Sequence, residues 1–188
     1  MNERFDLSRA ALDAFSARSH ERAHAATRAG KFRDQMVPIT ADPDDPTGPV
    51  IDSDEGIREH IDPAKMASLK AVFGADGRTT AANSSQISDG AAALLIADRE
   101  YAERNGLIPR ARFRALSVAA ADPIIQFTAI LDAAHKALGR SGLAVEEIDL
   151  FEVNEAFAGV PLIFQREFGV PDGKLNVNGG SVALGHPL

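Results

Sequence analysis

The second half of the chain alternates strand-like and helix-like segments, and this order constrains the fold more than any other feature. Residues 110–118 alternate apolar and charged side chains, as a strand with one solvent-exposed face does. Residues 128–140 carry an amphipathic helical pattern. Residues 148–154 and 174–180 are predicted to be short strands, and a helical segment at 155–169 separates them. Strands joined by helices in this way lie parallel in one sheet, so the sequence predicts a layered α/β domain.

The first half is predicted to contain three helices, one buried strand and a surface loop. The helices are expected over 8–29, 62–73 and 98–105, each starting at a Ser or Asp cap and ending before a glycine. The uninterrupted apolar run 91–97 has the length of a buried strand. Residues 41–50 hold three prolines and three aspartates, which favour a loop.

Composition narrows the class of protein. The chain of 188 residues is 45% apolar and 25% charged, which is typical of a soluble globular protein. It holds no apolar stretch of about 20 residues and no secretory signal at its start, so a cytoplasmic location without membrane contact is expected. The net charge of −7 argues against a nucleic-acid partner, because phosphate neutralisation needs clustered Lys and Arg. A small anionic ligand is still compatible with it.

The absence of cysteine restricts the chemistry that these residues can perform. With 0 cysteines among its 188 residues, the sequence contains no disulfide, thiolate metal site or cysteine nucleophile. His20 and His24 have the i, i+4 spacing of metal ligands, but no carboxylate completes a motif. A solvated helix face is the preferred interpretation of this pair, and no metal is expected.

Two polar residues are predicted to meet at one edge of the sheet. Asn154 ends the predicted strand 148–154, and His186 lies in the Gly-rich segment "NGGSVALGHP" that follows the next strand. Since ligand sites of parallel sheets collect at the carboxyl ends of strands, these side chains should approach each other. An amide and a neutral imidazole there could both donate to one developing oxyanion. A helix cap at Asn154 and an ordinary turn residue at His186 remain open alternatives.

The same segments resemble a known family. The motif "VNEAFAG" followed by "NVNGGSVALGHPL" is similar to the thiolases, which are CoA-dependent acyltransferases. "NSSQISDGAAALLI" resembles the family segment before a buried strand, and "ALDAFSARSHERA" with the following "GKF" and "VPI" resembles its loop domain. The likeness covers nearly the whole chain. It implies a thiolase-like layered αβαβα fold, truncated here, with the loop domain at the N-terminus.

The resemblance also implies a reaction and two catalytic residues. Thiolases cleave 3-oxoacyl-CoA with free CoA, or condense two acyl-CoAs in the reverse direction. One family cysteine carries the acyl group and a second moves a proton at the α-carbon. The family histidine corresponds to His186, which is expected to activate the first cysteine and donate to an oxyanion. The family asparagine corresponds to Asn154, which is expected to hold a water in the same oxyanion hole. CoA and acyl-CoA enter as substrates, with no bound cofactor.

Four further residues match family positions that contact the CoA substrate. Ala81 and Ser85 correspond to positions lining the pantetheine channel, and Arg58 to one near the nucleotide end of CoA. Phe157 is expected to wall the acyl pocket. Simpler roles stay open, because Arg58 could be a surface arginine and Ser85 a helix cap.

The chain departs from the family pattern at several positions. Ala82 and Gln86 stand where the family usually has Gly, and Ser88 stands where it has Asn. Gln126 and Phe127 lie near the part of the family fold that shapes the acyl pocket. These differences bear on the choice of substrate more than on the type of reaction.

The largest departure concerns the two cysteines. Their segments are expected before Met1 and after Leu188, so the chain is interpreted as a central-to-C-terminal piece of a thiolase. Residues 1–80 would be the remnant of the CoA-binding loop domain, 81–107 the end of the N-terminal half, and 108–188 part of the C-terminal half. An inactive CoA-binding remnant and one half of a split enzyme are the alternatives. A second copy or a complementary thiolase fragment is the expected protein partner.

Overall fold

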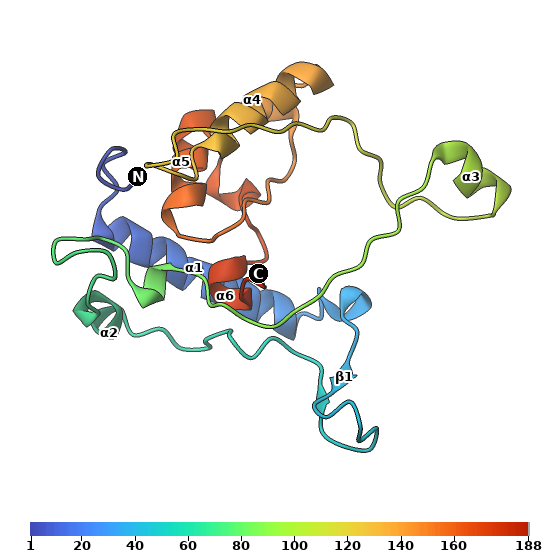
Figure 1. Cartoon of the computed structure of the whole chain (residues 1–188), viewed down its shortest axis with the longest axis horizontal. Helices are drawn as coiled ribbons and strands as arrows, with labels where there is room; N and C mark the ends of the chain where they lie inside the picture. Colours follow the sequence, from blue (N-terminus) through green and yellow to red (C-terminus); the bar gives the residue numbers. More distant parts are fainter. Residues whose placement is uncertain (188) are drawn as a thin grey trace.

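A computed structural model describes residues 1–187; Leu188, the last residue of the Gly-His-Pro-Leu motif, lies outside the described residues. Six α-helices, four short 3-10 helices and two short strands occur within this range (Figure 1). In chain order the elements are α1 (Arg9–Arg28), η1 (Arg33–Gln35), β1 (Ile39–Thr40), β2 (Val50–Ile51), α2 (Pro63–Ser68), η2 (Ala81–Asn83), α3 (Arg99–Arg104), α4 (Ala129–Ser141), η3 (Val145–Glu147), α5 (Gly159–Phe168), η4 (Asp172–Lys174) and α6 (Ser181–Leu184).

The core lies between α1, α5 and the segments that flank α5. Helix α1 starts where the Ser8 side chain accepts a hydrogen bond from the backbone N–H of Ala11. Its buried residues Leu12 and Phe15 pack into a cluster with residues from the 153–175 region. The other fully buried members of this cluster are Leu7, Val153, Ala158, Val160, Ile163, Phe164, Val170 and Leu175. The apolar periodicity of α1 thus attaches the first helix of the chain to its last quarter.

All five predicted helices are present, two of them with changed bounds. Helices α1, α3 and α4 occupy the expected segments, and Asp98 caps α3 through the N–H of Tyr101. Helix α2 begins at its predicted Asp62-Pro63 start but ends at Ser68, before the expected Gly74. Helix α5, predicted from residue 155, starts at Gly159, because residues 154–157 are engaged in contacts to neighbouring segments.

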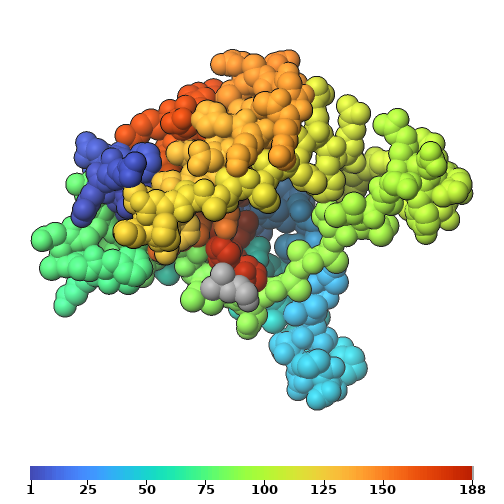
Figure 2. All heavy atoms as spheres, turned by 45° about the horizontal axis from the view of Figure 1, so that its top comes forward, coloured from blue at the N-terminus to red at the C-terminus, as the bar shows by residue number. Residues whose placement is uncertain are grey.

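The two strands predicted for the middle of the chain, at 91–97 and 110–118, are absent, so this prediction was wrong. The run 91–97 is exposed, with Leu94 and Leu95 at 80% and 83% accessibility. Residues 110–118 form no strand either, and Val118 is 87% exposed. A strand is stabilised by ladder hydrogen bonds to a neighbouring strand, and within the described residues no strand pairs with either segment. Figure 1 shows them leading out to α3 and back, and Figure 2 shows the resulting lobe projecting from the body of the molecule.

The two predicted strands around α5 do meet, although they pair at one point only. A parallel bridge joins Phe151 and Leu175, in which the Phe151 N–H donates to Lys174 and its carbonyl accepts from Asn176. The Asn176 side chain extends the pairing, since its Oδ1 accepts from the Val153 N–H and its Nδ2 donates to the Val153 carbonyl, both at 2.8 Å. The expected parallel order of these segments is therefore present in a shortened form.

Regular sheet is confined, in the part of the chain that the structure describes, to β1 and β2. These strands pair antiparallel, with Ile39 opposite Ile51 and Thr40 opposite Val50. They form a small hairpin that projects from the body, seen in Figure 2 as the pale blue lobe. Among residues 1–187 no helix has both the length and the apolar character needed to cross a bilayer.

Candidate active site

Asn154 and His186 lie in direct contact. The Asn154 Nδ2 atom is 2.9 Å from Nε2 of His186, although 32 residues separate them along the chain. The segment that ends at Asn154 and the one that precedes α6 run side by side through the Phe151–Leu175 bridge. Helix α6 then leads the chain to Gly185 and His186. The predicted meeting of the two side chains is what the structure shows, whereas their catalytic roles stay a prediction.

A serine completes a chain of three side chains. The Ser181 hydroxyl donates to Oδ1 of Asn154 at 2.8 Å, which leaves the amide nitrogen facing His186. An amide nitrogen only donates, so Nε2 of His186 is the acceptor and Nδ1 carries the proton of the neutral ring. Nδ1 lies 3.3 Å from the carbonyl of Pro187, which can accept that proton. His186 is therefore held with an unprotonated Nε2. Ser181 was not predicted as a partner of Asn154.

The segment 84–88 supports the pair from the other side. The backbone N–H of His186 donates to the Gln86 carbonyl at 2.8 Å, and Ile87 forms a parallel bridge with His186. One residue earlier, Ser85 donates from both its N–H and its hydroxyl to the carbonyl of Ala156. Ser85, predicted to line the pantetheine channel, thus lies between the two strand ends. Its hydroxyl is used within the protein rather than as a helix cap.

Two of the residues that depart from the family pattern touch this turn. Gly185 adopts φ +95°, and a Cβ built there would lie 2.4 Å from the Ser88 hydroxyl. Only glycine fits both the backbone conformation and the space. The Gln86 side chain reaches away from the turn and donates to the carbonyl of Gly56 at 3.2 Å. Gln86 therefore links the His186 turn to the segment that carries Arg58.

Arg58 and Ala81 occupy the edges of the site. Both are exposed, and the Arg58 backbone N–H donates to Nδ1 of His20 at 3.1 Å. This contact corrects the interpretation of His20 as part of a solvated helix face, because its side chain is buried at 5% accessibility. Ala81 begins η2, whose last residue Asn83 accepts from Ala158 through its backbone carbonyl. The structure thus brings Ser85, Asn154 and His186 together and leaves the other two at the periphery.

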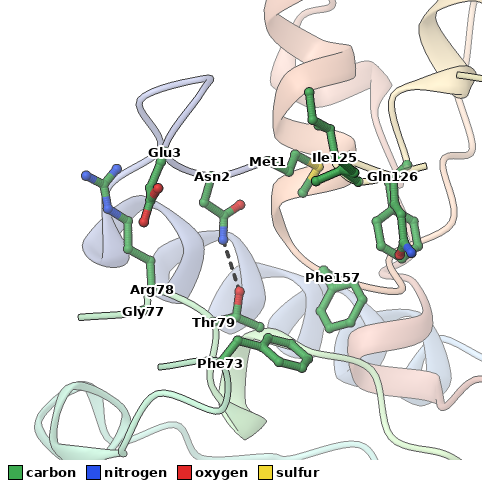
Figure 3. Close-up of a pocket in the computed structure, with 12 residues that line it drawn as sticks. Met1, Asn2, Glu3, Phe73, Gly77, Arg78, Thr79, Ile125, Gln126 and Phe157 are labelled. Carbon is green, nitrogen blue, oxygen red and sulfur yellow. Dashed lines mark hydrogen bonds between the residues drawn. The ribbon is translucent and has the colours of Figure 1, made fainter. Parts of the chain in front are cut away.

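Phe157 lines a cavity three residues beyond Asn154. The cavity has a volume of about 440 Å³, and its lining, part apolar and part polar, comes from distant parts of the chain. The Phe157 ring packs edge-on against Phe127 at 5.3 Å and against Phe73 at 6.3 Å between centroids (Figure 3). The rim is polar, with Asn2 Nδ2 donating to the Thr79 hydroxyl at 3.0 Å. A chamber of this size can hold a small group against the aromatic rings.

The arrangement has the chemistry of an acid–base and oxyanion site. The unprotonated nitrogen of a neutral imidazole can accept a proton, and an adjacent amide can donate a hydrogen bond to a negatively charged oxygen. Within residues 1–187 no group of three His, Asp or Glu side chains is placed to hold a metal ion.

Comparisons with known proteins agree with these motifs. Residues 1–100 match the family model described as "Thiolase, N-terminal domain", and residues 107–188 match "Thiolase, C-terminal domain". A 3-ketoacyl-CoA thiolase of Vibrio cholerae is 44% identical over 186 residues, covering 97% of this chain and 48% of the relative. A 3-ketoacyl-CoA thiolase of Bacillus subtilis is 40% identical over 194 residues, covering 99% and 50%.

Solved structures show the same fold. The crystal structure of human mitochondrial 3-ketoacyl-CoA thiolase superposes with a TM-score of 0.93 at 36% identity, over 100% of this chain and 47% of that one. The same enzyme in complex with CoA gives 0.91 at 35% identity, over 99% and 46%. The fold is therefore the predicted thiolase-like one, and the chain spans about half the length of the curated relatives it matches.

Proposed function

We propose that this chain, which belongs to the thiolase family, supplies the histidine–asparagine side of a CoA-dependent acyl-transfer site. The observation that carries the proposal is the 2.9 Å contact between Asn154 Nδ2 and His186 Nε2, with Ser181 fixing the amide. The reaction is the thiolytic cleavage of a 3-oxoacyl-CoA or its reverse, the condensation of two acyl-CoAs. Because residues 1–188 contain 0 cysteines, the thiol nucleophile has to come from polypeptide outside them.

In this proposal His186 has two successive tasks. With Nε2 unprotonated, His186 can accept the proton of an approaching thiol and leave a thiolate to attack the keto carbon. Once protonated, Nε2 becomes a donor and no longer accepts from Asn154. The imidazole and the amide then present two donors to the carbonyl oxygen on which negative charge develops. One proton transfer thus converts a hydrogen bond donated by Asn154 to His186 into an oxyanion hole with two donors.

The remaining site residues are assigned to the CoA substrate. Ser85 and Ala81 would border the pantetheine arm, and Arg58 would lie toward the nucleotide end, where its charge can meet phosphate. Phe157 and Phe127 would enclose the acyl chain at the aromatic side of the cavity of about 440 Å³. The relative crystallised with CoA supports this class of ligand.

A partner polypeptide completes the proposal. The exposed apolar run 91–97 and the alternating segment 110–118 need neighbouring strands, which a complementary thiolase segment or a second copy could provide. We place the assembled protein in the cytoplasm.

A hybrid enzyme tests the proposal. Residues 1–188 are joined to the flanking segments of the Vibrio cholerae relative, and thiolysis of acetoacetyl-CoA is followed. We expect turnover in the hybrid, a loss of about 10³-fold in kcat for His186→Gln and about 10²-fold for Asn154→Ala. The unjoined chain should give no thiolysis above a buffer blank, since it holds no thiol.

Matched controls separate the site from general effects. His135→Gln removes an exposed histidine that contacts Glu167 and the Phe168 ring, and Asn105→Ala removes an exposed asparagine at the end of α3. Both should keep the turnover of the parent hybrid. If His186→Gln were as active as His135→Gln, the proposed role of His186 would be wrong.

A further inference from the structure

Within residues 1–187, Glu155 is the one acidic residue that is completely buried, and it directly follows Asn154 in the chain. Its side chain has 0% accessibility, although a charged group is rarely buried without partners. Both carboxylate oxygens are occupied: Oε1 accepts from Asn176 Nδ2 at 2.8 Å, and Oε2 from the Ser19 hydroxyl at 2.6 Å and the Val182 N–H at 3.2 Å. All three partners donate, which suits the ionised form, because an ionised carboxylate only accepts.

These three donors belong to three different parts of the site. Ser19 lies on α1 and also accepts from the Gly180 N–H at 3.1 Å. Asn176 holds the Val153 backbone, two residues before Glu155. Val182 is the second residue of α6. The contact is tight as well, since a Cβ built on Gly180 would lie 2.4 Å from the Glu155 carboxyl carbon.

Each anchored position adjoins a residue of the proposed active site. Asn154 immediately precedes Glu155 and points outward, as the alternation of an extended segment requires. Ser181, which orients the Asn154 amide, immediately precedes Val182. His186 follows α6 after a single glycine. The carboxylate therefore sets the distance between the strand tip that bears Asn154 and the helix that leads to His186.

We propose that Glu155 is a positioning residue: its buried carboxylate ties α1, the Asn176 segment and α6 together and so holds Asn154 within hydrogen-bond distance of His186. The proposal rests on the assigned roles of those two residues, but it concerns their geometry and not turnover. Glu155 itself touches neither the substrate cavity nor the imidazole.

The test replaces the acceptor without changing its shape. In Glu155→Gln an amide NH₂ faces either Asn176 Nδ2 or the Ser19 and Val182 donors, so at least one hydrogen bond is lost. The isolated chain is labelled with ¹⁵N-histidine, and the ring nitrogens are observed by NMR, with His186→Gln assigning the signal. We expect the native ring to show an unprotonated Nε2 and the Glu155→Gln ring to show a mixture of both neutral forms.

Chemical modification gives a second readout. Diethyl pyrocarbonate acylates the free electron pair of a neutral imidazole, and peptide mass spectrometry compares His186 with the exposed His60 in the same sample. Modification of His186 should rise roughly fivefold in Glu155→Gln, the factor expected when a typical hydrogen bond to the ring is lost. Ile163→Val, which perturbs the buried core on α5, should leave both readouts unchanged.

A folded Glu155→Gln chain with native ring signals and native modification rate would overturn the proposal. If Glu155→Gln does not fold, Ser19→Ala decides, because it removes one donor and keeps the carboxylate. A smaller change of the same sign then supports the proposal, and native signals overturn it. If the ring signals of native and Glu155→Gln chains behave as expected but the parent hybrid enzyme shows no turnover, the result counts against the proposed function alone.

Discussion

Acid should destabilise the protein through a single buried histidine. His20 is 5% exposed on α1, and its Nδ1 accepts the backbone N–H of Arg58. Burial, and secondarily the positive charge of Arg58, lower the pKa of His20 from 6.5 to about 4. Protonation would remove the acceptor and place two positive charges together. The folded state therefore requires a neutral imidazole.

The size and sign of the effect follow from linkage. In the unfolded chain His20 has a pKa of 6.5, so between that pH and about 4 the unfolded state binds a proton at His20 and the folded state does not. The stability is fully present above pH 6.5 and is lost as the pH falls through the folded-state pKa of about 4. At about 1.4 kcal/mol for each tenfold difference in proton affinity, the loss between pH 7 and pH 4.5 is about 2 kcal/mol.

The assay compares two chains in urea. His20→Asn keeps an acceptor for the Arg58 N–H but cannot titrate, and the unfolding free energy is measured by circular dichroism at pH 7 and pH 4.5. Native protein should lose about 2 kcal/mol more than His20→Asn over this interval. Burial raises the pKa values of Glu155, Glu152 and Asp54, which gives contributions of opposite sign, but they are common to both chains and cancel.

A matched variant guards against a general histidine effect. His24→Asn removes the neighbouring, partly exposed histidine, which lies 3.9 Å from Glu59. It should retain the acid sensitivity of the native chain. Parallel losses of stability in native protein and His20→Asn would refute the reasoning, because the proton would then be taken up elsewhere.

Two further substitutions address the turn and the exposed apolar run. Gly185→Ala should lower the free energy of unfolding in urea by roughly 1–3 kcal/mol, because the φ of +95° and the 2.4 Å approach to Ser88 exclude a side chain. Gly173→Ala is the control, since a Cβ at Gly173 meets nothing within 4 Å. Equal stability of the two variants would contradict the strained turn. Leu95→Lys should reduce self-association in size-exclusion chromatography with light scattering, because Leu95 is 83% exposed in an apolar segment, while Ser53→Lys should not. A native chain that is monomeric at every concentration would contradict this expectation.

Helices were the part of the fold that local sequence specified well. Ser8, Asp62 and Asp98 accept hydrogen bonds from the first turns of α1, α2 and α3. Gly142 ends α4 in the left-handed conformation that its residue type favours. Capping involves atoms within a few residues of each other, so the information is contained in the segment itself. The α2 helix ended early because Leu69 turns to an extended conformation, which no cap signal had indicated.

Strands were predicted less well because their stability depends on distant neighbours. The apolar run 91–97 has the composition of a buried strand, yet it is exposed where nothing pairs with it. Composition can report that a segment needs burial, but it cannot supply the partner. His20 shows the converse, since a residue of ordinary surface type became buried through a contact with residue 58 that local sequence does not encode.

The Asn154–His186 contact was nevertheless predictable, because it requires only the parallel alignment of two short segments and not a complete sheet. One parallel bridge at Phe151–Leu175 fixes the direction and register of the two segments. The Asn176 side chain then replaces the next rung, because it bonds both polar atoms of the Val153 backbone. Glu155 was not predicted, although its position gave a signal: alternation along the strand directs it inward with Val153, and an inward carboxylate demands donors. Those donors, on α1 and α6, turn a weak pairing of strand ends into a fixed site.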